Sequence, residues 1–142
     1  MLKLMFFVML FSPFQMMTSQ SVSNYQWKNR LLIVLTENAE NSLVKEQLSI
    51  LEGNLKELKE RKLELIQVQP GKQKKLLLAG TDWESSNIYK ELKGNEADFE
   101  VLLIGLDGSI KLRQTKPVKT KQLFDLIDSM PMRQAEIRRK NN

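Results

Sequence analysis

Three short apolar runs along the chain have the pattern of buried strands. They occupy residues 30–36, 63–68 and 100–106, and the first reads Arg-Leu-Leu-Ile-Val-Leu-Thr. Runs of branched apolar residues without polar alternation are typical of strands that are buried on both faces of a sheet. We therefore predict three strands in the interior of one sheet.

A fourth strand is predicted directly after the third, as the second arm of a hairpin. The dipeptide Asp-Gly at 107–108 follows the third run, and Ile110 and Leu112 then alternate with Lys111 and Arg113. Asp-Gly between two strand patterns is a strong hairpin signal. The alternation predicts an edge strand that shows a basic face to solvent.

A long amphipathic helix is predicted between the first two strands. Its apolar residues recur at spacings of four, three, four and three: Val44, Leu48, Leu51, Leu55 and Leu58. At about 100° per residue they fall on one face, as in a helix that packs on a sheet. Asn41 or Ser42 can cap its N-terminus. Strand, helix and strand in this order form a βαβ unit, so the two strands are expected to be parallel.

A second helix is predicted before the third strand. Residues 81–84, Thr-Asp-Trp-Glu, have the form of a capping box, and the helix would run to Leu92 or Lys93 and end at residues 94–95, Gly-Asn. Residues 72–75 are interpreted as a basic loop. The pattern of residues 76–79 predicts no particular element.

The chain ends in helical segments. After Pro117, Thr120 can cap a helix that carries several apolar residues. Residues 130–132, Met-Pro-Met, break this helix, and residues 134–140 continue as a loose basic helix. The complete order is β-α-β-α-β-β-α, which is the thioredoxin-like order of elements in a single α/β domain.

The first 21 residues have the pattern of a secretory signal peptide. Lys3 is their only charged residue, and an apolar run spans residues 4–11. Ser19 and Ser21 place small side chains before a cut ahead of Val22. The run is shorter than the ~20 apolar residues that a membrane-spanning helix needs.

This leader predicts export, with a signal peptide over residues 1–21 and one domain over residues 22–140. The protein is then periplasmic or extracellular. A cut after Ser19 or after Ser23 stays open, and so does an uncleaved leader that lies in the membrane interface. Only that uncleaved leader would bring the chain to a membrane.

Charge is distributed unevenly. The chain has 22 Lys and Arg against 17 Asp and Glu, a net charge of +5. From residue 111 onward, Lys and Arg outnumber Asp and Glu nine to three. Such a basic third can meet an anionic partner, or it can be a solvated face. Because no nucleic-acid-binding motif accompanies it, nucleic acid is not expected as a partner.

Composition excludes several kinds of site. The chain contains no Cys and no His. Thiol chemistry, disulfides, the common zinc sites and Ser-His-Asp or Cys-His nucleophiles are therefore excluded. Asp82, Asp98 and Asp107 lack the spacing of an EF-hand, so we interpret them as cap, loop and turn residues. No catalytic residue, metal site or cofactor is predicted.

Three segments carry a family resemblance. They are residues 25–30, Tyr-Gln-Trp-Lys-Asn-Arg; residues 103–113, with Asp-Gly-x-x-Lys-x-Arg; and residues 124–136, with Met-Pro-Met-Arg. Together they resemble the thioredoxin-like domain of unknown function called P-DUDES. That domain occurs in short exported bacterial proteins, in sushi-repeat-containing proteins and in a coiled-coil-domain-containing matrix protein. Relatives often have lysine where this chain has Leu106, so no role is carried over to that position.

The resemblance implies a fold and an exported location, but no established activity. In thioredoxin-like enzymes the reactive thiol lies at the start of the long helix, and a cis-proline precedes the third strand. The corresponding residues 38–42 and 95–99 contain neither Cys nor Pro, and Ser42 has no His to activate it. Thiol oxidoreductase and peroxidase activities are therefore not expected.

The candidate functional residues are consequently binding residues. Trp27 is a core-covering aromatic with a bonded indole N–H, or a contact residue. Arg30 pairs with Asp128 or with a helix-end carbonyl, or it contacts a ligand. Lys111 and Arg113 project from the edge strand. If they converge with Arg133, the three form an anion site.

Two further features leave the function open. Met130 and Met132 around Pro131 provide an adaptable contact surface or a cap over the core. We expect an exported, non-catalytic interaction module whose partner is a protein or an anionic envelope or extracellular polymer. The alternative is an enzyme of unrecognised type that acts on a small anionic substrate.

Overall fold

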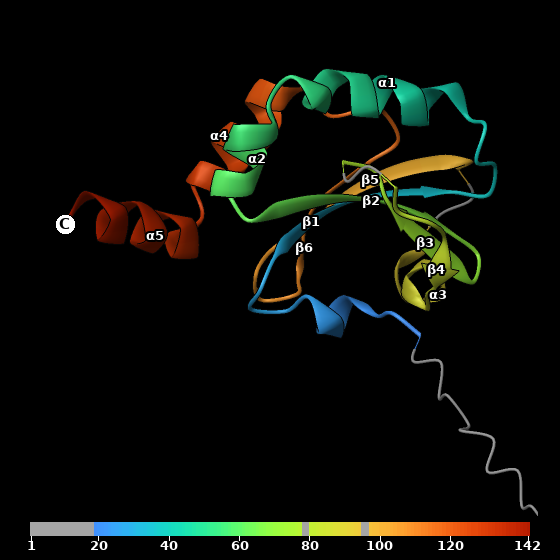
Figure 1. The fold of residues 1–142 in the computed structure, drawn as a ribbon, viewed down its shortest axis with the longest axis horizontal. Coiled ribbons are helices and arrows are strands. Elements are labelled where there is room, and N and C mark those ends of the chain that lie inside the picture. The colour runs from blue at the N-terminus through green and yellow to red at the C-terminus, as the bar shows by residue number, and fades with distance from the viewer. Residues whose placement is uncertain (1–18, 78–79, 95–96) are drawn as a thin grey trace, which may run out of the picture.

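One six-stranded sheet organises the chain, in the order β4-β3-β2-β1-β5-β6 (Figure 1). The computed structural model describes residues 19–77, 80–94 and 97–142. The strands β1 (Arg30–Thr36), β2 (Leu63–Gln69) and β5 (Phe99–Ile104) lie inside the sheet, and β6 (Ile110–Gln114) forms one edge, as predicted. All four were predicted. β1 is parallel to β2 and antiparallel to β5, and β6 is antiparallel to β5. This mixed α/β arrangement is compatible with a thioredoxin-like fold.

Every residue of β1 is buried, because this strand lies between β2 and β5 in a sheet that is covered on both faces. Its two faces support two separate cores. Leu32 and Val34 face the core under helices α1 (Ser42–Glu52), α2 (Leu55–Glu60) and α4 (Thr120–Asp128). Leu31 and Ile33 face the core under the 3₁₀ helix η1 (Val22–Asn24) and α3 (Ile88–Leu92). The sheet is therefore covered on both sides, which explains the run of apolar residues without alternation.

The last helix, α5 (Pro131–Asn141), extends beyond the body of the domain (Figure 1). The predicted break at residues 130–132 is confirmed, but Pro131 occupies the first turn of α5 rather than a loop. Proline is tolerated there because the first N–H groups of a helix have no intrahelical partner. The helix therefore begins three residues before the expected residue 134.

The predicted long helix is in fact two helices, which is a correction. α1 ends at Glu52, and Gly53 and Asn54 separate it from α2. Both residues have low helix propensity, so a break between them is favourable. Leu55 is consequently 51% exposed and does not join the apolar face that the spacing predicted.

The interpretation of residues 72–75 as a loop is wrong. These residues form β3 (Lys72–Lys75), antiparallel to β2. Gly71, at φ 76°, reverses the chain immediately after β2, in a conformation that glycine adopts without strain. The lysines of the segment lie on a half-exposed strand, whereas Gln73 is fully buried.

The capping box predicted at residues 81–84 is also wrong. Glu84 and Ser85 form the short strand β4 (Glu84–Ser85), and α3 begins only at Ile88. The Glu84 carboxylate accepts a hydrogen bond from Gln73 instead of reaching back toward the chain before it. α3 ends at Leu92, as expected, and residues 78–79, 95–96 and the leader to residue 18 lie outside the described part.

Within the described residues, no helix has the length and apolar character required to cross a bilayer.

Candidate functional site

A cavity of about 200 Å³ lies where three distant segments of the chain meet. It is lined by Arg30, residues 105–107, Lys111 and residues 130–132, and we call it the Arg30 cavity. Arg30 is the first residue of β1, so the cavity lies at the N-terminal end of that strand. The other end of β1 leads into α1. Each lining segment belongs to one of the three segments that carry the family resemblance.

Arg30 forms the buried wall of this cavity. Its Nη1 donates to the carbonyl of Arg61, 2.9 Å away, at the C-terminal end of α2. The guanidinium also pairs with the Glu136 carboxylate at 3.2 Å. The predicted bond to a helix-end carbonyl is therefore confirmed, whereas the predicted pairing with Asp128 is wrong.

The Nε of Arg30 is different from the other nitrogens of its guanidinium. It is buried, and the described part of the chain offers it no hydrogen-bond acceptor. A buried donor without a partner destabilises the fold by about 1–3 kcal/mol. This nitrogen has almost no accessible surface, so its missing partner is a cost of the fold itself.

Arg133 serves the fold rather than an open site. It is only 5% exposed, and its Nε donates to Asp128 at 3.1 Å. Its Nη1 donates to the backbone carbonyl of Glu60 at 3.2 Å, so this side chain joins α5 to α4 and α2. Burial would raise the pKa of Asp128, but hydrogen bonds from Arg61 and Arg133 outweigh it and hold that pKa below its ordinary value.

Lys111 stands at the mouth of the Arg30 cavity. Its ammonium pairs with Asp107 at 3.1 Å. The backbone N–H of Ser109, the Ser109 hydroxyl and Lys111 together lower the pKa of Asp107 to about 2, so this carboxyl is ionised at neutral pH. A Cβ at position 105 would lie 2.6 Å from the Lys111 side chain, so Gly105 is what lets the lysine stem lie against the hairpin.

Trp27 lies beside the cavity but does not cover the core. Its backbone N–H donates to the carbonyl of Leu106, which lines the cavity, at 2.7 Å. Its side chain is 62% exposed, so the interpretation as a buried covering residue is wrong. Tyr25, two residues earlier, takes the buried position at 8% exposure. Trp27 also has a φ of 66°, in the left-handed region that bulky residues rarely adopt.

Arg113 lies on the other side of the sheet. Its Nη1 donates to the fully buried carboxylate of Glu100 at 2.8 Å, and its Nη2 donates to the carbonyl of Leu92 in α3. Arg113 therefore lies on the α3 side, while Arg133 lies against α2 and α4. The predicted convergence of Lys111, Arg113 and Arg133 does not occur; Lys111 lines the same cavity as Arg30 instead.

Several residues that matter here gave no sequence signal. Glu136 pairs with two buried arginines, yet nothing in its local pattern distinguishes it from other helical glutamates.

Each of the two roles considered for the methionines is taken by one of them. Met130 packs against the core, and Met132 is exposed at the cavity. No cluster of three or more potential metal-ligating side chains occurs in the described ranges.

A family model described as "Domain of unknown function (DUF4174)" matches residues 21–136. No curated protein matches the chain.

Proposed function

We propose that this chain, which belongs to the DUF4174 family of domains of unknown function, is exported and binds a partner without catalysing a reaction. Its scaffold is thioredoxin-like. The resemblance of three segments to the P-DUDES domain, which occurs in exported and extracellular proteins, supports the same proposal. The surface that binds is the Arg30 cavity together with the exposed side chain of Trp27.

The observation that carries this proposal is the side chain of Trp27, which is 62% exposed while its backbone N–H donates to Leu106 in the wall of the Arg30 cavity. The cavity itself has apolar walls from Leu106, Met130 and Met132. Such a surface suits a small apolar group of a bound protein.

The charge of the cavity favours a protein partner over an anionic polymer. Arg30 is neutralised by Glu136, and Lys111 is neutralised by Asp107. A neutral acceptor, such as a backbone carbonyl of a bound peptide, therefore fits better than a string of negative charges. The exposed indole of Trp27 adds a rigid aromatic surface of the kind that protein interfaces favour.

Backbone strain at Trp27 supports the same surface. A non-glycine residue in the left-handed region costs about 1–2 kcal/mol, and Asn tolerates that region better than Trp. A large exposed aromatic held in this conformation contributes little to the core. Strain of this kind is typical of positions that are kept for function.

Replacing Trp27 by Asn separates binding from folding. We expect the free energy of unfolding to rise by about 1 kcal/mol, because Asn relieves the strain. A photoreactive phenylalanine analogue at Met132, 41% exposed, is expected to capture a protein partner in the native background and to lose it in Trp27→Asn. Urea unfolding and crosslinking from the envelope fraction measure the two effects.

The matched control places the same photoreactive analogue at Leu55, which is exposed on α2 away from the Arg30 cavity. Capture should not occur there. A partner captured equally at both positions, or retained by the Trp27→Asn protein, would contradict the proposed surface.

Export is part of the proposal, and the fold favours one processing site. The backbone N–H of Gln20 donates to Ser85 at 2.9 Å, and the Gln20 carbonyl accepts from Asn87 at 2.8 Å. A cut before Val22 would remove both bonds, whereas a cut after Ser19 keeps them. We expect the intact mass of the exported chain to show Gln20 as its first residue; a chain that begins at or after Val22 would contradict this.

A further inference from the structure

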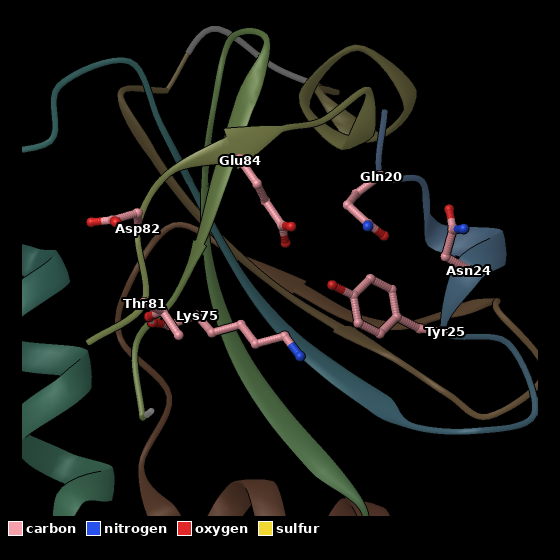
Figure 2. A pocket seen from close by; sticks show the side chains of 7 residues that line it. All are labelled: Gln20, Asn24, Tyr25, Lys75, Thr81, Asp82 and Glu84. Atoms are coloured by element: carbon pink, nitrogen blue, oxygen red, sulfur yellow. The ribbon is translucent and has the colours of Figure 1, made fainter. Parts of the chain in front are cut away.

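A second cavity, of about 390 Å³, lies against β3 and β4 and is lined entirely by polar side chains. Figure 2 shows the Lys75 ammonium, the Tyr25 hydroxyl, the Gln20 amide and the Glu84 carboxylate facing one space, while Asp82 points away from it. We call it the Tyr25 cavity. It shares no lining residue with the Arg30 cavity.

A buried amide determines which atoms donate into this space. The side-chain nitrogen of Gln73 lies 3.0 Å from a Glu84 carboxylate oxygen and 2.8 Å from the Tyr25 hydroxyl. A carboxylate only accepts, so the atom that faces Glu84 must be the amide nitrogen. The Gln73 oxygen accepts from the Ser86 hydroxyl at 2.8 Å, which agrees with this orientation.

The Tyr25 hydroxyl is left with a proton to donate. The Gln73 amide nitrogen has two hydrogens and gives one to Glu84 and one to Tyr25, so the phenol oxygen is an acceptor in that bond. Within the described ranges, the proton of the Tyr25 hydroxyl has no acceptor, although the residue is more than nine-tenths buried. Burial raises the pKa of Tyr25, so the hydroxyl keeps this proton.

Lys75 and Glu84 complete a mixed set of hydrogen-bonding groups. The Lys75 ammonium pairs with Glu64 at 3.1 Å, so its charge is neutralised while hydrogens remain to donate. Burial would lower the pKa of Lys75, but Glu64 outweighs it and the pKa lies above its ordinary value. One carboxylate oxygen of Glu84 accepts the hydrogen bond from Gln73, and the other oxygen remains available as an acceptor.

We propose that the Tyr25 cavity binds a neutral saccharide, of one or two sugar units. Neighbouring sugar hydroxyls both accept and donate, so one ring can accept from Tyr25 and Lys75 while it donates to Glu84. The Gln20 amide adds a further donor and acceptor, and the Asn24 amide nitrogen adds a donor, while the Asn24 oxygen accepts from the Ser21 backbone N–H. A volume of about 390 Å³ is at the small end of ligand pockets, which agrees with a small polar ligand.

The charges argue against an acidic and against a zwitterionic ligand. Lys75 is already paired with Glu64, so a ligand carboxylate finds no unpaired cation there. The Glu84 carboxylate disfavours an acidic sugar by repulsion. A zwitterion would need a free charge of each sign, whereas Lys75, the cation in the lining of this cavity, is already paired with Glu64.

Titration with simple sugars tests the proposal. D-glucose, D-galactose and N-acetyl-D-glucosamine are added separately to the isotope-labelled full chain and followed by backbone amide NMR. We expect saturable shifts at Tyr25, Gln73, Lys75 and Glu84 with at least one of them. Glu84→Gln keeps the shape and removes the free carboxylate oxygen; it should weaken the affinity about tenfold, the effect of one hydrogen bond to a charged group.

Two further proteins keep the result interpretable. Tyr25→Phe removes the proposed donor, and its melting temperature is measured first because Gln73 also loses an acceptor. Lys111→Ala alters the Arg30 cavity only, so it should bind the sugars as the native chain does. Absence of shifts with all three sugars, or shifts with L-alanine alone, would overturn the proposal. If the Trp27 experiment captures no protein partner, the saccharide proposal is unaffected, because that experiment concerns the Arg30 cavity.

Discussion

Replacing Glu136 by Ala will lower the free energy of unfolding by about 3–5 kcal/mol. The Glu136 carboxylate pairs with Arg30 at 3.2 Å and with Arg133 at 3.4 Å. Both arginines are buried, and Arg30 is fully so. Without the carboxylate, two buried positive charges remain without their shared partner, and α5 loses its attachment to the start of β1.

Urea unfolding measures this effect, with Asp125→Ala as the matched control. Asp125 pairs with Lys121 on the exposed surface of α4, at the helical i,i+4 spacing. Exposed pairs of this kind contribute about 0.3–0.5 kcal/mol. If Glu136→Ala lowers stability no more than Asp125→Ala does, the buried network does not hold α5 in place.

The second large effect concerns Arg113, which the sequence suggested as a binding residue. We expect Arg113→Glu to lower the free energy of unfolding by about 3–5 kcal/mol, because it removes the closest cation from the fully buried carboxylate of Glu100. Among the described residues, Lys93 is then the one cation paired with that carboxylate, at 3.6 Å. The new carboxylate adds repulsion to this loss.

Acid distinguishes this mechanism from a general loss of packing. Protonation of the carboxyl that this substitution introduces removes its repulsion with Glu100. The difference in unfolding free energy between Arg113→Glu and the native chain should therefore narrow as the pH falls from 7 toward 4. Arg138→Glu, an exposed arginine on α5, serves as the control and should change stability by less than about 0.5 kcal/mol at either pH.

This result would change how a loss of binding is interpreted. A variant that carries Arg113→Glu or Arg133→Glu loses buried ion pairs, so its failure to bind a partner would report unfolding rather than a lost contact. Trp27→Asn avoids this difficulty, since Trp27 is exposed and its replacement relieves strain. Lys111→Ala is the equivalent choice on the hairpin, because its pair with Asp107 lies at the surface.

Most of the sheet was predictable because strand burial leaves a local pattern. The runs at residues 30–36, 63–68 and 100–106 became β1, β2 and β5, and the Asp-Gly signal marked the β5–β6 turn. β3 was missed because Lys72, Lys74 and Lys75 hide the strand pattern in a charged segment. Their stems lie on a half-exposed strand, where long basic side chains are tolerated because their charged ends reach water.

The candidate site was predictable in its segments but not in its pairing. Trp27, Arg30, Lys111 and the Met-Pro-Met segment were singled out, and all four meet at or beside one cavity. The sequence did not predict which of the basic residues line that cavity. The burial of Tyr25 was not predictable either: in the sequence it is one residue of the motif at 25–30, and in the structure it is the buried aromatic of that segment.

The sequence by itself determined β1, β2, β5 and β6, the hairpin, the two C-terminal helices and the chemistries that are absent for want of Cys and His. These depend on neighbours a few positions away, where periodicity and turn residues act directly. Only the tertiary structure decided that Arg30 pairs with Glu136, 106 positions later, and that Gln73 meets Tyr25, 48 positions earlier. The partner of a charged or polar side chain depends on which elements the fold brings together, and charges of the same kind leave the same local pattern whether they hold the core or face solvent.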